Sequence, residues 1–173
     1  MSMFDRIERA RLENLHFRHD PKSGLKAIIA IHNTRLGPAL GGCRFVSYAS
    51  EDDALDDVIR LARGMSYKAA LAGVPQGGGK AVILKPADSE IDREALYKAF
   101  GHFVDSLGGR YITAADSGTQ LADLDQVARV TPYVSGTSTD GFNPSPITAL
   151  GVYAGIKAAV LHQLKRDSLS GLL

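Results

Sequence analysis

The sequence has a single cysteine and no long hydrophobic run, and each shortage excludes a class of protein. Cys43 cannot form an intramolecular disulfide, and five histidines without partner thiols predict no metal site of the zinc type. The longest apolar run, residues 27–31, is much shorter than the ~20 residues that a membrane span needs. The charged N-terminal segment lacks the apolar core of a signal peptide. We therefore expect a cytoplasmic protein without a metal ion or a membrane partner.

Net charge is also nearly absent. Twenty Lys and Arg residues against nineteen Asp and Glu residues leave a formal charge of +1. This balance offers no basic surface for nucleic acid and no polybasic patch for a membrane. With 45% hydrophobic and 23% charged residues, the composition is that of a globular protein. A chain of 173 residues buries roughly 70% of its unfolded surface, so we expect it to fold without disulfides.

Glycine is the abundant residue, with 18 of 173 positions and no Gly-x-y repeat. The densest segment, GVPQGGGK at residues 73–80, lacks both the first glycine and the final Ser or Thr of a phosphate-binding P-loop. No G-x-G-x-x-G dinucleotide fingerprint occurs among the glycines. A simpler interpretation is a flexible glycine loop that carries a solvated Lys80. A second glycine-rich segment, GPALGGCR at residues 37–44, indicates a turn with Arg44 as a surface charge.

Apolar periodicity alternates between the patterns of strands and helices. A strand around residues 15–17, a turn at 20–24 and an apolar run at 25–31 predict a hairpin whose second strand is central and buried on both faces. Four helices with capping residues and two short strands are predicted at residues 50–71, 92–107, 121–130, 145–165, 81–84 and 111–113. The pattern predicts an α/β fold with a mixed sheet flanked by helices.

Three charged side chains could meet in one pocket. Lys68 borders the apolar face of its helix, Lys80 follows three glycines, and Asp116 lies in the turn after residues 111–113. Two lysines and a carboxylate together suit acid–base chemistry on a small ligand. Each residue also has a simpler explanation: Lys68 as a surface lysine with a buried stem, and Asp116 as the N-cap of the helix at 121–130. The five histidines are interpreted as structural or surface residues.

A resemblance to a known family is carried by four motifs: GPALGGCR at 37–44, RLARGMSYKAALAGVPQGGGKAVI at 60–83, YITAADSGT at 111–119 and NPSPITALGVYAGIKAA at 143–159. In this order they closely resemble the amino-terminal half of the Glu/Leu/Phe/Val amino-acid dehydrogenases, with the leucine and branched-chain members closest. The resemblance implies a substrate-binding and oligomerisation domain at residues 1–144. It also implies a linker helix at 145–173, leading toward an NAD-binding Rossmann domain that is absent from these residues.

The reaction implied by this family is the reversible oxidative deamination of an L-amino acid to a 2-oxo acid and ammonia. By resemblance, Lys68 holds the substrate carboxylate as a charge-assisted hydrogen-bond donor. Lys80 is the catalytic lysine, which activates the water that attacks the imino acid, and Asp116 moves protons to and from the amino group. Without a cofactor domain, we expect these 173 residues to be inactive alone and to self-associate.

Further residues of the site are implied by the same resemblance: Leu40, Gly41, Gly42, Met65, Gly77 and Gly78 around the substrate, and Thr148 near the nicotinamide. Family members that act on glutamate carry a lysine at the position of Leu40. An apolar Leu40 would leave the glutamate side-chain carboxylate buried and unpaired, so glutamate is disfavoured. Leucine, valine and isoleucine are the expected substrates, and phenylalanine is the alternative.

Two functions of other classes remain open at this point. The chain could be a standalone binding and oligomerisation module that has lost catalysis. Lys80 could instead form a Schiff base with a 2-oxo acid, which requires only one domain.

Overall fold

The computed structural model describes residues 2–86, 91–140 and 145–172, which fall into two units, Met1–Asp140 and Gly141–Leu173. The domain boundary that we expected after residue 144 borders residues 141–144, which are outside the described residues. The elements of the first unit are α1 (Met3–Ala10), β1 (Asn14–Asp20), β2 (Leu25–Asn33), β3 (Ala39–Val46), α2 (Glu51–Ala72), β4 (Gly77–Leu84), α3 (Arg93–Asp105), β5 (Tyr111–Ala115), α4 (Leu121–Ala128) and the 3₁₀ helix η1 (Ser138–Asp140). The second unit contains α5 (Ser145–Leu164).

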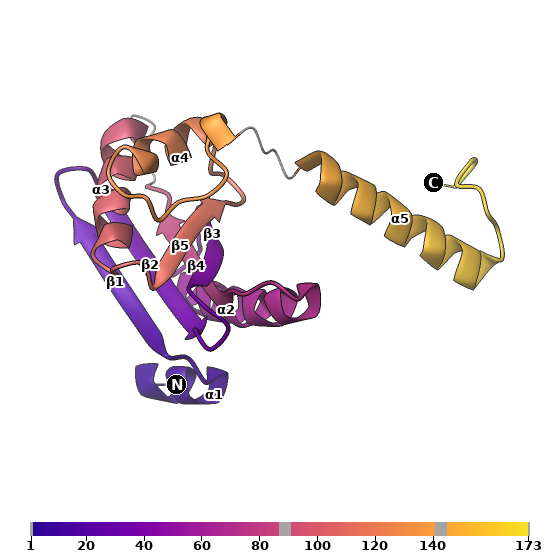
Figure 1. Ribbon diagram of the computed structural model, residues 1–173, viewed down its shortest axis with the longest axis horizontal. Coiled ribbons are helices and arrows are strands. Elements are labelled where there is room, and N and C mark those ends of the chain that lie inside the picture. Colours follow the sequence, from indigo (N-terminus) through magenta and orange to yellow (C-terminus); the bar gives the residue numbers. More distant parts are fainter. Residues whose placement is uncertain (1, 87–90, 141–144, 173) are drawn as a thin grey trace. The chain divides into compact units, whose positions relative to one another are not determined.

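The strands form one mixed sheet with the order β1-β2-β4-β3-β5 (Figure 1). β2 pairs antiparallel with both β1 and β4, whereas β3 pairs parallel with both β4 and β5. β2 is therefore an inner strand, and most of its side chains are buried, as its continuous apolar pattern predicts. The predicted α/β fold with a mixed sheet flanked by helices is confirmed.

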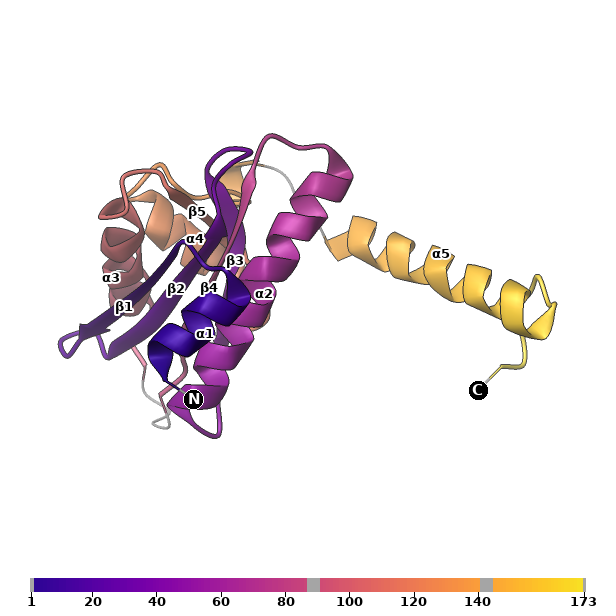
Figure 2. The same cartoon turned by 90° about the horizontal axis from the view of Figure 1, so that it is seen from below.

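Helices cover the two faces of the sheet unequally. α3 and α4 pack on one face over a core that includes Ile29, Phe45, Tyr97, Phe100 and Tyr111. α1 and α2 lie on the opposite face (Figure 2). There α2 packs on β2 and β4 and makes few contacts with β3. The part of this face that β3 and β5 form is therefore less covered, and its side chains are only half-buried.

Two strands begin where the sequence indicates turns or loops. The segment GPALGGCR is not a turn, because residues from Ala39 onward form β3 between β4 and β5. β4 begins at Gly77 rather than at residue 81, so the three glycines before Lys80 are strand residues and not a flexible loop. The sequence pattern misses both because glycine carries no side chain whose alternation would mark a strand.

The starts of α2 and α3 follow the expected capping residues, whereas α3 ends at Asp105, two residues before the expected end. The Ser50 hydroxyl accepts a hydrogen bond from the Asp53 N–H at the start of α2, and the Asp92 carboxylate does the same for Ala95 at the start of α3. Gly73 ends α2 with a φ of +65°. α1 was not expected from periodicity, since it is short and buries none of its residues.

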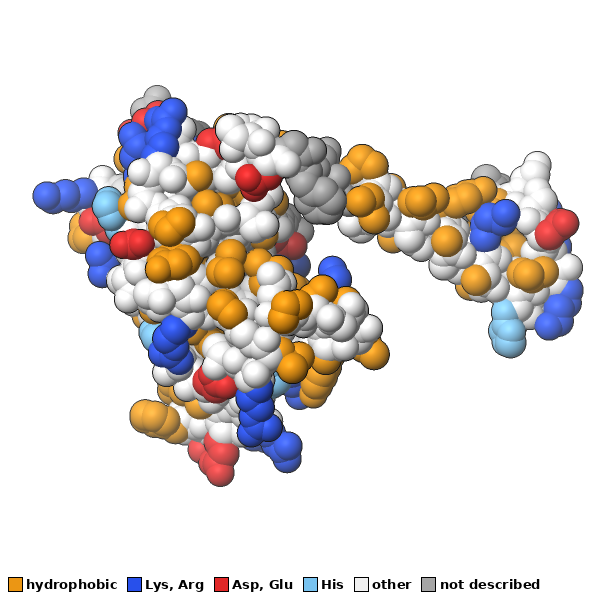
Figure 3. Space-filling model, viewed as in Figure 1, with side chains coloured by type: hydrophobic (Ala, Val, Ile, Leu, Met, Phe, Trp, Pro, Cys, Tyr) orange, Lys and Arg blue, Asp and Glu red, His pale blue; other side chains and the backbone are white. Residues whose placement is uncertain are grey.

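α5 is a mostly apolar helix with no buried residue (Figure 3). Among the described residues it is the one helix long and apolar enough to cross a membrane by length and composition, with a mean hydropathy of 1.3. The rule of counting consecutive apolar residues misses this property, because glycine, threonine and a lysine interrupt the run. A helix of this kind also occurs in soluble proteins, where other parts of the protein cover it.

Candidate active site

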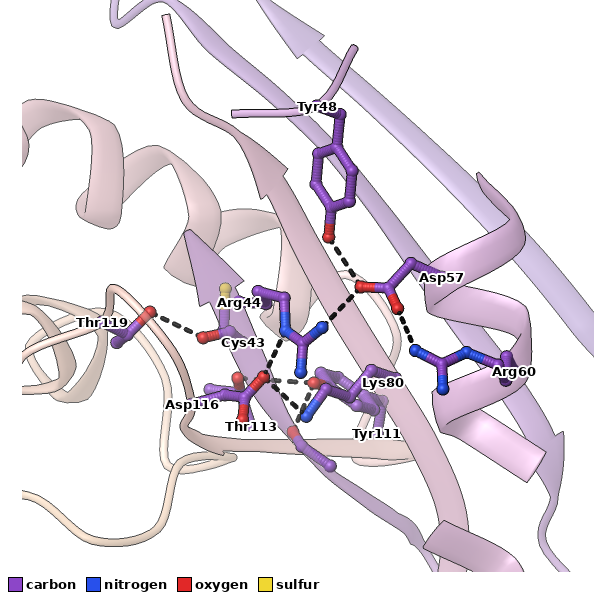
Figure 4. Close-up of polar contacts among 11 residues, drawn as sticks. Cys43, Arg44, Tyr48, Asp57, Arg60, Lys80, Tyr111, Thr113, Asp116 and Thr119 are labelled. Carbon is purple, nitrogen blue, oxygen red and sulfur yellow. Dashed lines mark hydrogen bonds and ion pairs between the residues drawn. The ribbon is translucent and has the colours of Figure 1, made fainter. Parts of the chain in front are cut away.

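Lys80 and Asp116 form a direct ion pair on the less covered part of the sheet. Lys80 comes from the interior of β4, and Asp116 follows the last residue of β5. Lys80 Nζ lies 3.0 Å from Asp116 Oδ2, and the Lys80 side chain is only 7% exposed (Figure 4). Lys80 is therefore not a solvated surface lysine. Asp116 is not a helix cap either, because Gln120 is the N-cap residue of α4.

Arg44 connects this pair to α2. Its Nε donates to Asp116 Oδ2 at 2.9 Å, and its Nη1 donates to Asp57 Oδ2 at 2.7 Å (Figure 4). The Tyr48 hydroxyl donates to the same Asp57 oxygen at 2.9 Å, and Arg60 donates to the other at 2.8 Å. The expectation that Arg44 is a surface charge is wrong, since its side chain is 23% exposed and bridges two carboxylates.

The neighbouring cations keep Asp116 ionised. Burial by itself raises the pKa of the Asp116 carboxyl. The hydrogen bond and charge of Lys80, and then those of Arg44, lower this pKa by a larger amount. The net effect holds the pKa of Asp116 below its ordinary value. Beneath the pair, burial raises the pKa of the Cys43 thiol, so the thiol stays protonated. At neutral pH the site thus holds a carboxylate able to accept a proton.

The predicted glycines lie at points of close approach within the protein. A Cβ added at Gly42 would lie 2.5 Å from the Ala115 carbonyl oxygen and 2.9 Å from the Asp116 Cβ. A Cβ added at Gly78 would lie 2.1 Å from the backbone nitrogen of Ser66 in α2. The other two predicted glycines pack against strand backbone in the same way: Gly41 and Gly77. Strand and helix packing therefore explains these glycines, and contact of their backbone with a substrate stays a prediction.

The residues expected to bind the substrate differ in their position relative to this ion pair. Leu40 is half-buried on β3, in register with Gly78 of β4. Lys68 is exposed on α2, eleven residues or about three helical turns after Asp57, so both lie on the flank that faces β3. Met65 is half-buried one turn before Lys68. The structure brings Leu40 to the site and puts Lys68 and Met65 on the adjoining flank of α2.

Some site residues were not expected from the sequence. Ile112 and Ala114 are half-buried on β5, and alternation puts them on the same face as Asp116. The segment YITAAD carries that signal, because its alternate residues share one face of a strand. Asp57 carries no comparable signal, since it is one of five acidic residues between positions 51 and 57.

Thr148 lies exposed on α5, in the second unit. Its expected place near a nicotinamide stays a prediction. Within residues 2–86, 91–140 and 145–172, no group of three or more His, Cys, Asp or Glu residues is placed to hold a metal ion.

The fold and the site together define a class: an α/β domain with a buried lysine–aspartate pair on the open part of its sheet. Residues 11–133 match the family described as Glu/Leu/Phe/Val dehydrogenase, dimerisation domain. The chain belongs to this family. The resemblance of its four motifs to the amino-terminal half of these enzymes is confirmed.

Relatives of known function match almost the whole chain. Leucine dehydrogenase of Geobacillus stearothermophilus is 52% identical over 175 residues, which cover 99% of this chain and 47% of the relative. Valine dehydrogenase of Streptomyces virginiae is 52% identical over 155 residues, or 88% of this chain and 43% of the relative. The crystal structure of L-tryptophan dehydrogenase from Nostoc punctiforme matches with a TM-score of 0.75 and 43% identity, covering 98% of this chain and 48% of that one. The chain spans about half the length of the curated relatives it matches.

Proposed function

We propose that this chain is the substrate-binding half of an L-amino-acid dehydrogenase that oxidises leucine, valine or isoleucine to the 2-oxo acid and ammonia. The observation that carries the proposal is the Lys80–Asp116 ion pair at 3.0 Å, on the part of the sheet that also presents Leu40. The proposal is also supported by sequence identities of 52% between this chain and a leucine and a valine dehydrogenase. A standalone binding module has no need for a lysine whose side chain is 7% exposed.

In the proposed reaction, each charged residue acts at one atom of the substrate. Lys68 binds the carboxylate of the amino acid, as an ammonium donor on the flank of α2. Asp116 takes a proton from the substrate ammonium group, because its carboxylate is ionised at neutral pH. Lys80 holds the water that attacks the imino carbon, and this water loses a proton to solvent as the C–O bond forms. Asp116 then returns its proton to the nitrogen, so that the C–N bond breaks and ammonia leaves. The Lys80–Asp116 contact lets the two side chains share the protons that move.

NAD is the hydride acceptor that this reaction implies. The chain contains no G-x-G-x-x-G, and of the glycines before Lys80, Gly77 and Gly78 pack against protein backbone and Gly79 against the side chains of Tyr111 and Ala39. These residues therefore do not form a dinucleotide-binding fingerprint. In our proposal the cofactor is held by a Rossmann domain outside this chain, with Thr148 near the nicotinamide, and the chain alone is inactive. When bound, NAD accepts the hydride from the substrate carbon.

An aliphatic substrate fits the side chains that accompany the ion pair. Leu40, Met65, Ile112 and Ala114 are half-buried and uncharged. A carboxylate buried among such side chains would lack a partner, which disfavours glutamate. An aromatic amino acid is a second candidate, because the L-tryptophan dehydrogenase of Nostoc punctiforme is 45% identical over 99% of this chain.

Self-association through the first unit is part of the same proposal. We also propose that the enzyme is cytoplasmic. β1 is an edge strand of the sheet, and an unpaired edge is available to a second chain. Phe17 of β1 is 53% exposed beside a groove of about 970 Å³ that Met3, Lys26 and Leu55 also line. Exposed apolar surface of this kind is typical of a protein–protein contact.

Ligand binding to the 173-residue chain tests the substrate class. In ¹⁵N–¹H NMR titrations with millimolar amino acids, we expect L-leucine to shift the amide signals of Leu40, Gly42 and Lys80. L-glutamate should shift them far less. Lys68→Met should abolish the response, because it removes the ammonium group that binds the substrate carboxylate and keeps a flexible, unbranched stem.

The control for this titration is Lys98→Met, which removes a surface lysine that pairs with Glu94 on α3. It should leave the leucine response intact. An equal response to leucine and glutamate, or a leucine response confined to other parts of the sheet, would contradict the proposed substrate site.

A further inference from the structure

The guanidinium of Arg44 joins carboxylates that come from different sides of the site. We propose that Arg44 is a positioning residue: it fixes one oxygen of the Asp116 carboxylate and leaves the other free to exchange a proton with the substrate. Asp57 of α2 is the anchor that holds Arg44 in place. This inference rests on the proposed function, which gives Asp116 its role in proton transfer.

Both cations of the site contact the same oxygen of Asp116. Arg44 Nε lies 2.9 Å from Oδ2, and Lys80 Nζ lies 3.0 Å from Oδ2. In the described parts of the chain, the side-chain contacts to this carboxylate thus converge on Oδ2. A carboxylate held at one oxygen by two donors from adjacent strands cannot rotate without losing both bonds. Oδ1 is the atom assigned to the substrate.

Arg44 is itself held at its other end. Its Nη1 donates to Asp57 Oδ2, and the Asp57 side chain is 12% exposed. The Tyr48 hydroxyl and Arg60 donate to the same carboxylate. Movement of Arg44 away from Asp116 would leave Asp57 short of a cationic partner in a half-buried position, which is costly. A planar guanidinium with several donors can bridge two carboxylates, whereas a lysine ammonium on a flexible stem cannot hold the same fork.

Charge also favours the bridge. The groups that face Asp116 are Arg44 from β3 and Lys80 from β4, and Asp57 from α2 stands behind Arg44. With Arg60, which also pairs with Asp57, these charges sum to plus one with Arg44 present and to zero without it. Removal of Arg44 therefore makes protonation of Asp116 easier, and its pKa should rise toward or above the ordinary value.

NMR on the 173-residue chain tests the positioning without any need for turnover. The ¹³Cγ signal of Asp116 is followed against pH in the wild type and in Arg44→Gln. We expect a higher midpoint in Arg44→Gln, because Asp116 loses one of its two cationic partners. The matched control is Arg6→Gln, because Arg6 bridges Asp52 and Asp56 on α2 by the same kind of contact but away from the site. An Asp116 midpoint that is the same in Arg44→Gln as in the wild type would overturn the proposal.

Turnover is measured in a chimera in which this chain replaces the matching part of the Geobacillus stearothermophilus leucine dehydrogenase. In metal sites, loss of a residue that orients a ligand lowers activity by about 10- to 100-fold. Arg44 orients Asp116 in a comparable way, so we expect Arg44→Gln to lower kcat by a similar factor with little change in KM. The acidic limb of the kcat–pH profile should move to higher pH. Arg6→Gln should match the wild type in both readings.

Chemical rescue distinguishes positioning from general damage to the fold. In Arg44→Ala, millimolar guanidinium should restore part of kcat, because it can occupy the vacated position between the two carboxylates. Methylammonium should restore much less, because it lacks the planar fork. Rescue by neither cation in a variant that keeps the wild-type Tm would contradict the bridge.

The outcomes separate this inference from the proposed function. A wild-type chimera that folds but oxidises no amino acid would contradict the proposed function, and the Asp116 titration would still decide the positioning. An active chimera in which Arg44→Gln keeps the wild-type kcat and pH profile would overturn the role of Arg44 alone.

Discussion

Asp116 combines a half-buried carboxylate with two cationic partners, and its protonation is therefore coupled to stability. Burial raises the pKa of this carboxyl, and Lys80 and then Arg44 lower it to a net value below the ordinary 3.8. A lowered pKa in the folded state means that the contribution of Asp116 to stability is complete above the pKa of the unfolded chain. It is lost as the pH falls through the lower pKa of the folded chain.

We therefore expect the stability difference between the wild type and Asp116→Asn to depend on pH in one direction. The free energy of unfolding, measured with urea between about pH 7 and pH 3, should be higher for the wild type at neutral pH. The difference should shrink only on the acidic side of about pH 4. A difference that grows on acidification would contradict the assignment of an ionised Asp116.

Leu40 is the residue where the choice between substrates can be changed directly. In the chimera, Leu40→Lys should raise the ratio of kcat/KM for glutamate over leucine. A charge-assisted hydrogen bond contributes about 1.5–3 kcal/mol, so the expected rise is on the order of tenfold to a hundredfold. Leu40→Met is the matched control, because it keeps the volume and leaves the site uncharged. If Leu40→Lys changes the ratio no more than Leu40→Met does, Leu40 does not contact the substrate side chain.

The charged residues of the site differ in how far the sequence predicts them. Lys80 and Asp116 stand in motifs that resemble a family, and their contact agrees with the expected convergence. Arg44 was misjudged as a surface charge because its partners are 13 and 72 residues away in the chain. Contacts at such separations depend on the order of the strands, which local patterns do not contain.

At the scale of elements, the approach of β4 to α2 depends on a glycine. An added Cβ at Gly78 would lie 2.1 Å from the Ser66 nitrogen and 2.2 Å from its Oγ. Backbone cannot yield as a flexible side chain does, so we expect Gly78→Ala to lower the free energy of unfolding by about 1–3 kcal/mol or more. Urea titration of the 173-residue chain measures this change.

The control lies on the same helix. Gly64 is a residue of α2, and an added Cβ there meets no other atom within 4 Å. Gly64→Ala should stabilise the chain by about 0.5–1 kcal/mol, because alanine costs less conformational entropy in a helix. A destabilisation by Gly78→Ala no larger than about 0.5 kcal/mol would show that α2 can shift away from β4.

Elements with strong side-chain patterns were predicted well, and elements built on glycine were not. The buried run of β2 and the capped starts of α2 and α3 follow from local residues. β3 and the first half of β4 do not, because small residues there report close packing between strands rather than alternation. Because β3 and β4 also carry Arg44 and Lys80, the strands beneath the site were the least predictable part of the fold.

At the scale of the molecule, every buried core residue in the described part of the chain lies in the first unit. The two core clusters run from Leu12 to Val127, and α5 contributes no buried residue. A chain that ends at Asp140 should therefore keep its Tm within about 2 °C of the full 173 residues. Calorimetry measures this, and a fall of about 5 °C or more would mean that the second unit stabilises the first.

The central claim is that the Lys80–Asp116 site acts on an aliphatic L-amino acid, and oxidation of leucine by the chimera tests it most directly. The measurement is kcat/KM with NAD for leucine, valine, isoleucine and glutamate, in the wild-type chimera and in its Lys80→Ala variant. We expect turnover of the three aliphatic amino acids, far less of glutamate, and a loss of about 100- to 10,000-fold in kcat for Lys80→Ala. A folded, NAD-binding chimera that prefers glutamate, or that keeps its rate without Lys80, would contradict the claim.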